Sequence, residues 1–270
     1  HITPELMFRL AKEVDGRLAE PGVSGAVVVH GTDVMEETAF MLDLVVTSSK
    51  PVVFTGSMRF FGELGYDGLR NLIFGVKAAA SPLLQGLGTV VLMADQIFAA
   101  SETVKVHSTM IDPFDAPGLG PIGFIAEDGV HLLRGPARRV ALKPDRIVSN
   151  VDLLKCSPGM DSRFIEASRD GDAAGLVVEG FGAGNVPPGI TPALISLVEL
   201  GRPVVLCTRC LKGGVRPLYG YPGGAADLLS RGLISGGRLS GSKARIMLMA
   251  ALGLTDALDR VRNFFEHDYC

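Results

Sequence analysis

A threonine and an aspartate follow a short run of valines, at a point where the pattern of the chain changes. The valines are residues 27–29, and Thr32 and Asp33 come after a histidine and a glycine. Behind them, apolar residues recur at steps of three and four, which is the spacing of one buried helix face. Thr32 and Asp33 are therefore expected at the start of a helix, where free backbone N–H groups and a partial positive charge favour a bound anion or a developing oxyanion.

A helix cap is the simpler interpretation of the same residues. Thr32 or Asp33 would accept a hydrogen bond from the first helical turn, and Glu36 would complete the capping pattern. Caps are far commoner than catalytic sites, so the local pattern alone favours this interpretation. Lys105 presents a similar choice, because the partly alternating polar stretch at residues 102–109 is typical of a solvated lysine.

Helices and strands alternate along the first part of the chain. The expected elements are a helix at 5–19, a strand at 25–30, a helix at 33–47, a strand at 51–55, a helix at 67–80 and a strand at 88–93. This order is typical of a parallel sheet with helices on its faces, and ligands bind such sheets beyond the carboxyl ends of the strands. Those ends carry Thr32, Asp33, Ser57 and Asp95, so these side chains are expected to gather at one edge of the sheet.

The pattern predicts the α/β fold class and two domains. A mostly parallel open sheet is expected in the larger N-terminal domain, residues 1–135, which ends in a hairpin at 124–133. A linker is expected at 136–149 and a smaller α/β domain at 150–270. The buried face of the first helix is predicted to consist of Leu6, Leu10, Val14 and Leu18.

Composition narrows the classes of partner. Of the 270 residues, 47% are hydrophobic and 20% are charged, which is ample material for a packed core. The net charge of −3 argues against nucleic acid or an anionic membrane as the main partner. The chain has no apolar run of the roughly eighteen residues that a membrane-spanning helix needs.

Neither a metal nor another cofactor is expected. Cys207 and Cys210 form a lone C-x-x-C pair without the second ligand pair that a zinc site normally has. The five histidines form no H-E-x-x-H motif. The glycines at residues 180–184 lack the spacing of a dinucleotide fingerprint, and a glycine turn at a strand end is the favoured interpretation.

The stretch His30-Gly-Thr-Asp-Val-Met-Glu-Glu-Thr38 closely resembles a signature of the bacterial-type L-asparaginase and glutaminase-asparaginase family. In that family a strand runs into H-G-T-D-T-M-E-E-T, and only Val34 departs from it here. The resemblance covers essentially the whole chain and outweighs the simpler interpretations of Thr32 and Lys105. Further matches occur in the family's order at residues 50–59, 67–71, 104–105, 120–123 and 242–245.

The resemblance implies an amidohydrolase of the threonine-nucleophile type, which converts L-asparagine to L-aspartate and ammonia without a cofactor. It assigns catalytic roles to Thr32, Lys105 and Asp33 and substrate-binding roles to Thr32, Asp33 and Ser57. Thr32 matches the second of the family's two threonines. A threonine hydroxyl needs a neighbouring base, and a lysine serves as that base only when burial or nearby charges lower its pKa. Asp33 is then suited to bind the substrate's α-ammonium group. Ser57 matches a position whose backbone carbonyl approaches the leaving amide.

The sequence departs from the family in one catalytic motif. The family begins with a strand that leads into T-G-G-T-I-A, which carries its first threonine, and this sequence has no counterpart. We expect that segment to precede His1 in the natural protein, because a parallel sheet without it would lack a buried neighbouring strand. If it were truly absent, Thr32, Asp33 and Lys105 would bind an amino acid but hydrolyse poorly.

Further departures concern the partner subunit and the compartment. Family members are usually dimers of close dimers, so a homotetramer is expected. The partner's asparagine found in some exported members aligns near Ala183, and its glutamate falls at residues 223–226, which carry no carboxylate. Discrimination between asparagine and glutamine therefore stays open. Ser49 stands near one position of a disulfide found in some periplasmic members, which favours a cytoplasmic location.

L-asparaginase is the leading hypothesis, and three alternatives remain. One is a broader glutaminase-asparaginase. Another is a non-catalytic amino-acid-binding homologue. The last is the amidase part of a larger amidotransferase that acts with a second protein or with tRNA, although the acidic net charge disfavours tRNA.

Overall fold

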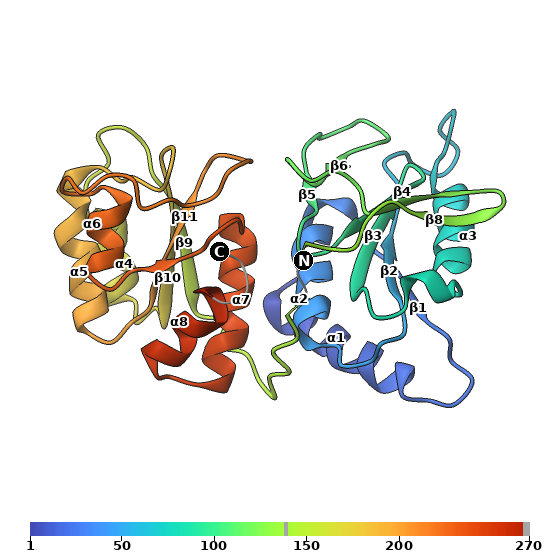
Figure 1. Cartoon of the computed structure of the whole chain (residues 1–270), viewed down its shortest axis with the longest axis horizontal. Helices are drawn as coiled ribbons and strands as arrows, with labels where there is room; N and C mark the ends of the chain where they lie inside the picture. Colours follow the sequence, from blue (N-terminus) through green and yellow to red (C-terminus); the bar gives the residue numbers. More distant parts are fainter. Residues whose placement is uncertain (138–139, 267–270) are drawn as a thin grey trace. The chain divides into compact units, whose positions relative to one another are not determined.

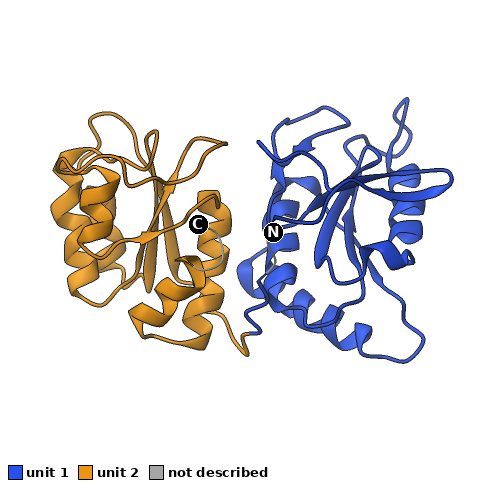
Figure 2. Ribbon diagram, in the orientation of Figure 1, with its two compact units in different colours: residues 1–143 blue, residues 144–270 orange. Residues whose placement is uncertain are grey.

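The computed structural model describes residues 1–137 and 140–266. The chain divides into two compact units, residues 1–143 and 144–270 (Figure 2). Residues 138 and 139 of the predicted linker, and residues 267–270 of the predicted second domain, lie outside the described residues. Each unit is built around its own sheet with helices on both faces, which confirms the predicted α/β class.

The first unit holds a six-stranded mixed sheet in the order β1-β2-β3-β4-β7-β8. The strands β1, β2 and β3 are parallel, whereas β4, β7 and β8 are antiparallel to their neighbours, so this sheet is mixed and not mostly parallel as expected. The predicted hairpin is β7–β8, and β5 and β6 form a separate two-stranded sheet. The elements are α1 (Pro4–Leu18), β1 (Ala26–Val29), η1 (Thr32–Val34), α2 (Met35–Val45), β2 (Val52–Thr55), α3 (Gly68–Ala79), η2 (Pro82–Leu84), β3 (Thr89–Met93), β4 (Gln96–Ala99), β5 (Val104–Lys105), β6 (Phe114–Asp115), β7 (Gly123–Ala126) and β8 (Gly129–Leu132).

The two faces of this sheet are covered by different helices. Successive strand residues point to opposite faces, so Val53 and Val90 lie on one face, where they pack with Phe74 of α3. Figure 1 shows α2 on the opposite side of the sheet from α3. The helix α2 is buried along almost its whole length, and α1 packs against it.

The crossovers through α2 and α3 have opposite hands. The steps from β1 to β2 and from β2 to β3 run in the same direction across the sheet between parallel strands. Their helices nevertheless lie on opposite faces (Figure 1). Since nearly all such crossovers are right-handed, one of these two is an exception to that rule.

The turn between β3 and β4 is strained. Met93 pairs with Gln96, so the hairpin loop has two residues, Ala94 at φ 48° and Asp95 at φ 64°. Positive φ at both positions is the type I′ conformation, in which the first position prefers asparagine or glycine. Alanine there brings its Cβ close to the following carbonyl oxygen, at a cost of about 1 kcal/mol.

We expect Ala94→Asn to stabilise the protein. Asparagine tolerates the left-handed region, so the free energy of unfolding should rise by about 0.5–1 kcal/mol. Urea unfolding followed by circular dichroism measures the change. Ala94→Val is the contrasting variant, because a β-branched residue is strongly disfavoured at positive φ, and it should destabilise. If the parent, Ala94→Asn and Ala94→Val were equally stable, the inference of backbone strain at this turn would be contradicted.

The second unit is a parallel four-stranded sheet in the order β12-β11-β10-β9. A core of buried aliphatic side chains, including Leu176, Leu194 and Leu206, fills the space between the sheet and α5. Among the described residues, no helix is both long enough and apolar enough to cross a membrane. The elements are β9 (Val151–Lys155), α4 (Arg163–Asp170), β10 (Gly175–Gly180), η3 (Pro188–Ile190), α5 (Thr191–Glu199), β11 (Val204–Thr208), α6 (Ala225–Ser230), β12 (Ile234–Ser235), α7 (Gly241–Leu254) and α8 (Leu258–Glu266).

Candidate active site

The residue Lys105 brings together two of the predicted site residues. Its Nζ atom lies 3.0 Å from the Thr32 hydroxyl oxygen and 2.8 Å from a carboxylate oxygen of Asp33. Thr32 and Asp33 stand just beyond the carboxyl end of β1, whereas Lys105 comes from β5, more than seventy positions later. Three polar groups from distant parts of the sequence therefore meet at the edge of the sheet where ligands bind in α/β proteins.

Thr32 is buried and does not cap a helix. It is the first residue of the short 3₁₀ turn η1, whose N-cap is Gly31 and which has no side-chain cap. The following helix α2 has Val34 as its N-cap, also without a side-chain cap. The cap interpretation of Thr32 and Asp33 is therefore wrong. The hydroxyl of Thr32 is instead turned toward the amine of Lys105.

Asp33 combines a short ion pair with an open carboxylate. Its side chain is 95% exposed, and Lys105 contacts one of its oxygens. The hydrogen bond from Lys105, and then the positive charge of Lys105, hold the pKa of Asp33 below its ordinary value. Asp33 is thus a carboxylate that keeps its charge in mild acid and remains accessible to a cationic ligand group.

Lys105 is not a solvated lysine. Its side chain is only 16% exposed, and β5 pairs with β6 through Val104 opposite Asp115 and Lys105 opposite Phe114. The backbone N–H of Lys105 donates a hydrogen bond to the carboxylate of Glu36. The capping pattern had assigned Glu36 to its own helix, so local sequence gave no sign of this long-range contact.

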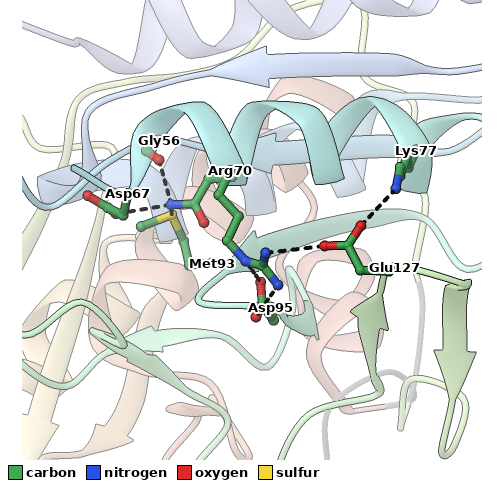
Figure 3. Close-up of polar contacts among 8 residues, drawn as sticks. Gly56, Asp67, Arg70, Lys77, Met93, Asp95 and Glu127 are labelled. Carbon is green, nitrogen blue, oxygen red and sulfur yellow. Dashed lines mark hydrogen bonds and ion pairs between the residues drawn. The ribbon is translucent and has the colours of Figure 1, made fainter. Parts of the chain in front are cut away.

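Ser57 follows β2 in a segment that α3 holds in place. The carboxylate of Asp67 accepts hydrogen bonds from the backbone N–H groups of Met58 and Arg59. The amide of Asn71 donates to Gly56 O at 2.9 Å and to Asp67 at 3.0 Å (Figure 3). The backbone on both sides of Ser57 is therefore fixed. Within the described residues, Ser57 makes no hydrogen bond to Thr32, Asp33 or Lys105.

Asp95 does not join this group. Its carboxylate forms a bidentate pair with Arg70 of α3, at 2.9 and 3.0 Å, on the side of the sheet that α3 covers. Figure 3 shows Arg70 reaching from Asp95 to Glu127, which also pairs with Lys77. The expectation that Asp95 gathers with the site residues is therefore wrong, and Asp95 holds the β3–β4 turn against α3.

The two cysteines of the C-x-x-C pair belong to the second unit, Cys207 within β11 and Cys210 just after it. Across the described ranges, no group of three histidine, cysteine or acidic side chains is placed to hold a metal ion. Cys207 and Cys210 are both free thiols, the first buried and the second exposed. Burial raises the pKa of Cys207, which keeps that thiol protonated and unreactive.

Comparison with known proteins gives consistent matches over both units. Residues 1–138 match the family model described as asparaginase, N-terminal, and residues 150–265 match the glutaminase/asparaginase C-terminal domain. An L-asparaginase of Bacillus licheniformis is 36% identical over 252 residues, which is 93% of this chain and 78% of the relative. A probable L-asparaginase of Deinococcus radiodurans is 37% identical over 269 residues, which is 98% of this chain and 81% of the relative. A crystal structure described as a probable cytoplasmic L-asparaginase from Campylobacter jejuni has a TM-score of 0.89 and 31% identity, and the match covers 98% of this chain and 84% of that one.

Proposed function

We propose that Thr32, Lys105 and Asp33 carry catalytic and binding roles in amide hydrolysis, because this chain belongs to the L-asparaginase family. The chain is an asparaginase-type amidohydrolase, which releases L-aspartate and ammonia from L-asparagine. The observation that supports the assignment is the 3.0 Å contact between Lys105 Nζ and Thr32 Oγ1. It places a base within reach of a hydroxyl that is otherwise a weak nucleophile.

The proposed chemistry needs one proton to move twice. The attacking oxygen, Thr32 Oγ1 or a water hydrogen-bonded to it, adds to the amide carbon as its proton passes to Lys105, which must first release the proton that it carries in the ion pair with Asp33. The same proton then passes to the amide nitrogen as the C–N bond breaks, and ammonia leaves. When water is the attacking group, the acid product forms in this step; when Thr32 attacks, a water molecule then hydrolyses the ester left on Thr32, which frees L-aspartate and restores the hydroxyl. Backbone N–H groups near Gly31 and Thr32 would stabilise the oxyanion that forms in between.

Asp33 and Ser57 have binding roles in this proposal. The open carboxylate of Asp33 suits the α-ammonium group of an amino acid, and its lowered pKa preserves the charge that attracts that group. The backbone carbonyl of Ser57 would accept a hydrogen bond from the leaving amide. The fixed backbone on either side of Ser57 supports this role, because a positioned acceptor costs little reorganisation during the reaction.

Membership of the family also supports a proposal for the oligomeric state of the protein and for its location in the cell. We propose a homotetramer built as a dimer of dimers, which acts on small-molecule substrates. A cytoplasmic location is proposed because the Campylobacter jejuni structure is described as that of a probable cytoplasmic L-asparaginase. No cofactor, nucleic acid or membrane enters the proposed reaction.

A substrate panel tests the proposed function. We expect the full-length natural protein to release ammonia from L-asparagine with a kcat/KM at least about tenfold above that for L-glutamine, the discrimination that one methylene permits. Comparable values would favour the broader glutaminase-asparaginase. Calorimetric binding of L-aspartate without turnover of either amide would favour the non-catalytic homologue, and activity only in complex with a second protein or tRNA would favour the amidotransferase.

A further inference from the structure

The segment that carries Lys105 stands apart from the six-stranded sheet. Lys105 ends the two-residue strand β5, and the only strand that pairs with it among the described residues is β6. Beyond it, the N–H of Val106 donates to Pro113 O, which again lies within the same small ribbon. The ladder of the large sheet therefore does not fix the position of Lys105.

Hydrogen bonds on two sides help to attach this ribbon to the rest of the unit. On the side of β4, both the N–H and the hydroxyl of Thr103 donate to Ala99 O. On the side of α2, the backbone N–H of Lys105 donates to the Glu36 carboxylate, and its Nζ reaches Thr32 and Asp33. Glu36 thus holds the backbone of the residue whose side chain contacts the candidate site.

Glu36 and Thr32 are arranged to act on Lys105 together. They are four positions apart, with Thr32 at the start of η1 and Glu36 in the first turn of α2. Thr32 contacts the far end of Lys105, and Glu36 contacts its backbone. Since α2 follows η1 directly in the chain, one short segment contacts both the backbone and the amine of Lys105.

The carboxylate of Glu36 is well suited to this contact. Glu36 is only 8% exposed. A carboxylate is stable in a buried position only where hydrogen bonds from the protein replace those that it would make to water. Glu36 lies in the first turn of α2, where the helix dipole favours a negative charge. A hydrogen bond from a backbone N–H to an ionised carboxylate is also shorter and stronger than one to a neutral acceptor.

We propose that Glu36 is a positioning residue for catalysis, which fixes the backbone of Lys105 so that its amine stays in contact with Thr32. This inference rests on the proposed function of Thr32 and Lys105, and it adds a residue that does not touch the substrate. A displacement of about 1 Å at a reacting group can cost about a hundredfold in rate. Loss of the Glu36 anchor should therefore appear in kcat.

The helix α2 offers a matched control in Asp43. That carboxylate is also buried, and it accepts a 2.9 Å hydrogen bond from the backbone N–H of Thr89 at the start of β3. Asp43→Ala and Glu36→Ala thus remove the same kind of contact from the same helix, but only Glu36 contacts Lys105. We expect Glu36→Ala to lower kcat by about 10- to 100-fold, with KM changed less than kcat. Asp43→Ala should leave kcat per folded molecule unchanged. Glu36→Gln, which keeps an acceptor oxygen, should recover most of the loss.

A double variant separates positioning from general damage. If Glu36 acts through Lys105, adding Glu36→Ala to Lys105→Met should lower kcat no further than Lys105→Met alone, because residues that act as a unit are not additive. Additive losses, or equal kcat values for Glu36→Ala and Asp43→Ala, would overturn the positioning role while leaving the role of Lys105 intact. Full activity of Lys105→Met would instead overturn the proposed function, and this inference with it.

Discussion

Replacing Thr32 by valine is expected to lower kcat for L-asparagine by about a thousandfold. Valine keeps the β-branched shape of the buried side chain but removes the oxygen that Lys105 Nζ contacts at 3.0 Å. Without that oxygen, the amine of Lys105 has no hydroxyl to deprotonate and none through which to activate water. Ammonia release under saturating asparagine measures the change, and calorimetry should show that L-aspartate still binds, because Asp33 is unaltered.

Thr89→Val is the matched control for this variant. Thr89 is also a buried threonine of the first unit, but its hydroxyl has no hydrogen-bond partner among the described residues. It lies at the amino end of β3, and the candidate site lies beyond the carboxyl ends of the strands. We expect its kcat to equal that of the parent. If Thr32→Val and Thr89→Val were equally active, the catalytic role of Thr32 would be refuted.

Lys105→Met should have two effects that arise from the same atom. The first is a loss in kcat of about 10²–10⁴-fold, the usual contribution of a positioned base. The second concerns Asp33, whose pKa Lys105 lowers through a hydrogen bond and then through its charge. With Lys105 gone, the pKa of Asp33 returns toward its ordinary value, so its carboxylate is protonated at a higher pH than in the parent.

The sign of the second effect can be measured directly. The attraction of Asp33 for an ammonium group is present above its pKa and is lost as the pH falls through that value. As the pH is lowered, the affinity for L-aspartate should therefore decrease at a higher pH in Lys105→Met than in the parent. The titration of L-aspartate itself affects both proteins equally, so it does not contribute to this difference. Lys77→Met is the control. It removes a lysine of α3 that pairs with Glu127, away from Thr32, and it should leave both kcat and the pH profile unchanged. A profile in Lys105→Met that matches the parent would show that Asp33 does not bind the ammonium group.

Periodicity in the sequence predicted the elements of the fold well but left their orientation uncertain. The first helix was expected to bury Leu6 and Leu10, whereas the buried stripe begins with Met7 and Ala11. One residue corresponds to a rotation of about 100° around a helix. Because both alternatives are apolar, the pattern cannot choose between them, and packing against α2 decides. Val14 and Leu18 belong to both stripes and are buried as predicted.

The site shows the same division between local and long-range information. The motif at Thr32 and Asp33 could be recognised in the sequence because its residues are adjacent. Lys105 was assigned to the same site only through the resemblance to a family. The contact of Glu36 with Lys105 spans 69 positions, so a local capping rule explained Glu36 wrongly. Asp95 was misplaced for a related reason, since its partner Arg70 belongs to a helix on the opposite face from α2. The order of the strands predicts which strand ends lie at the same edge of the sheet. Only the hand of each crossover decides which helix lies beside those ends.

The separate β5–β6 ribbon allows rate and stability to evolve independently. Substitutions in the six-stranded sheet alter the cohesion of the core, whereas substitutions in the ribbon move Lys105 without disturbing the pairing of the large sheet. A shift of the ribbon can therefore move the amine of Lys105 relative to the Thr32 hydroxyl while the strand pairing of the large sheet stays the same.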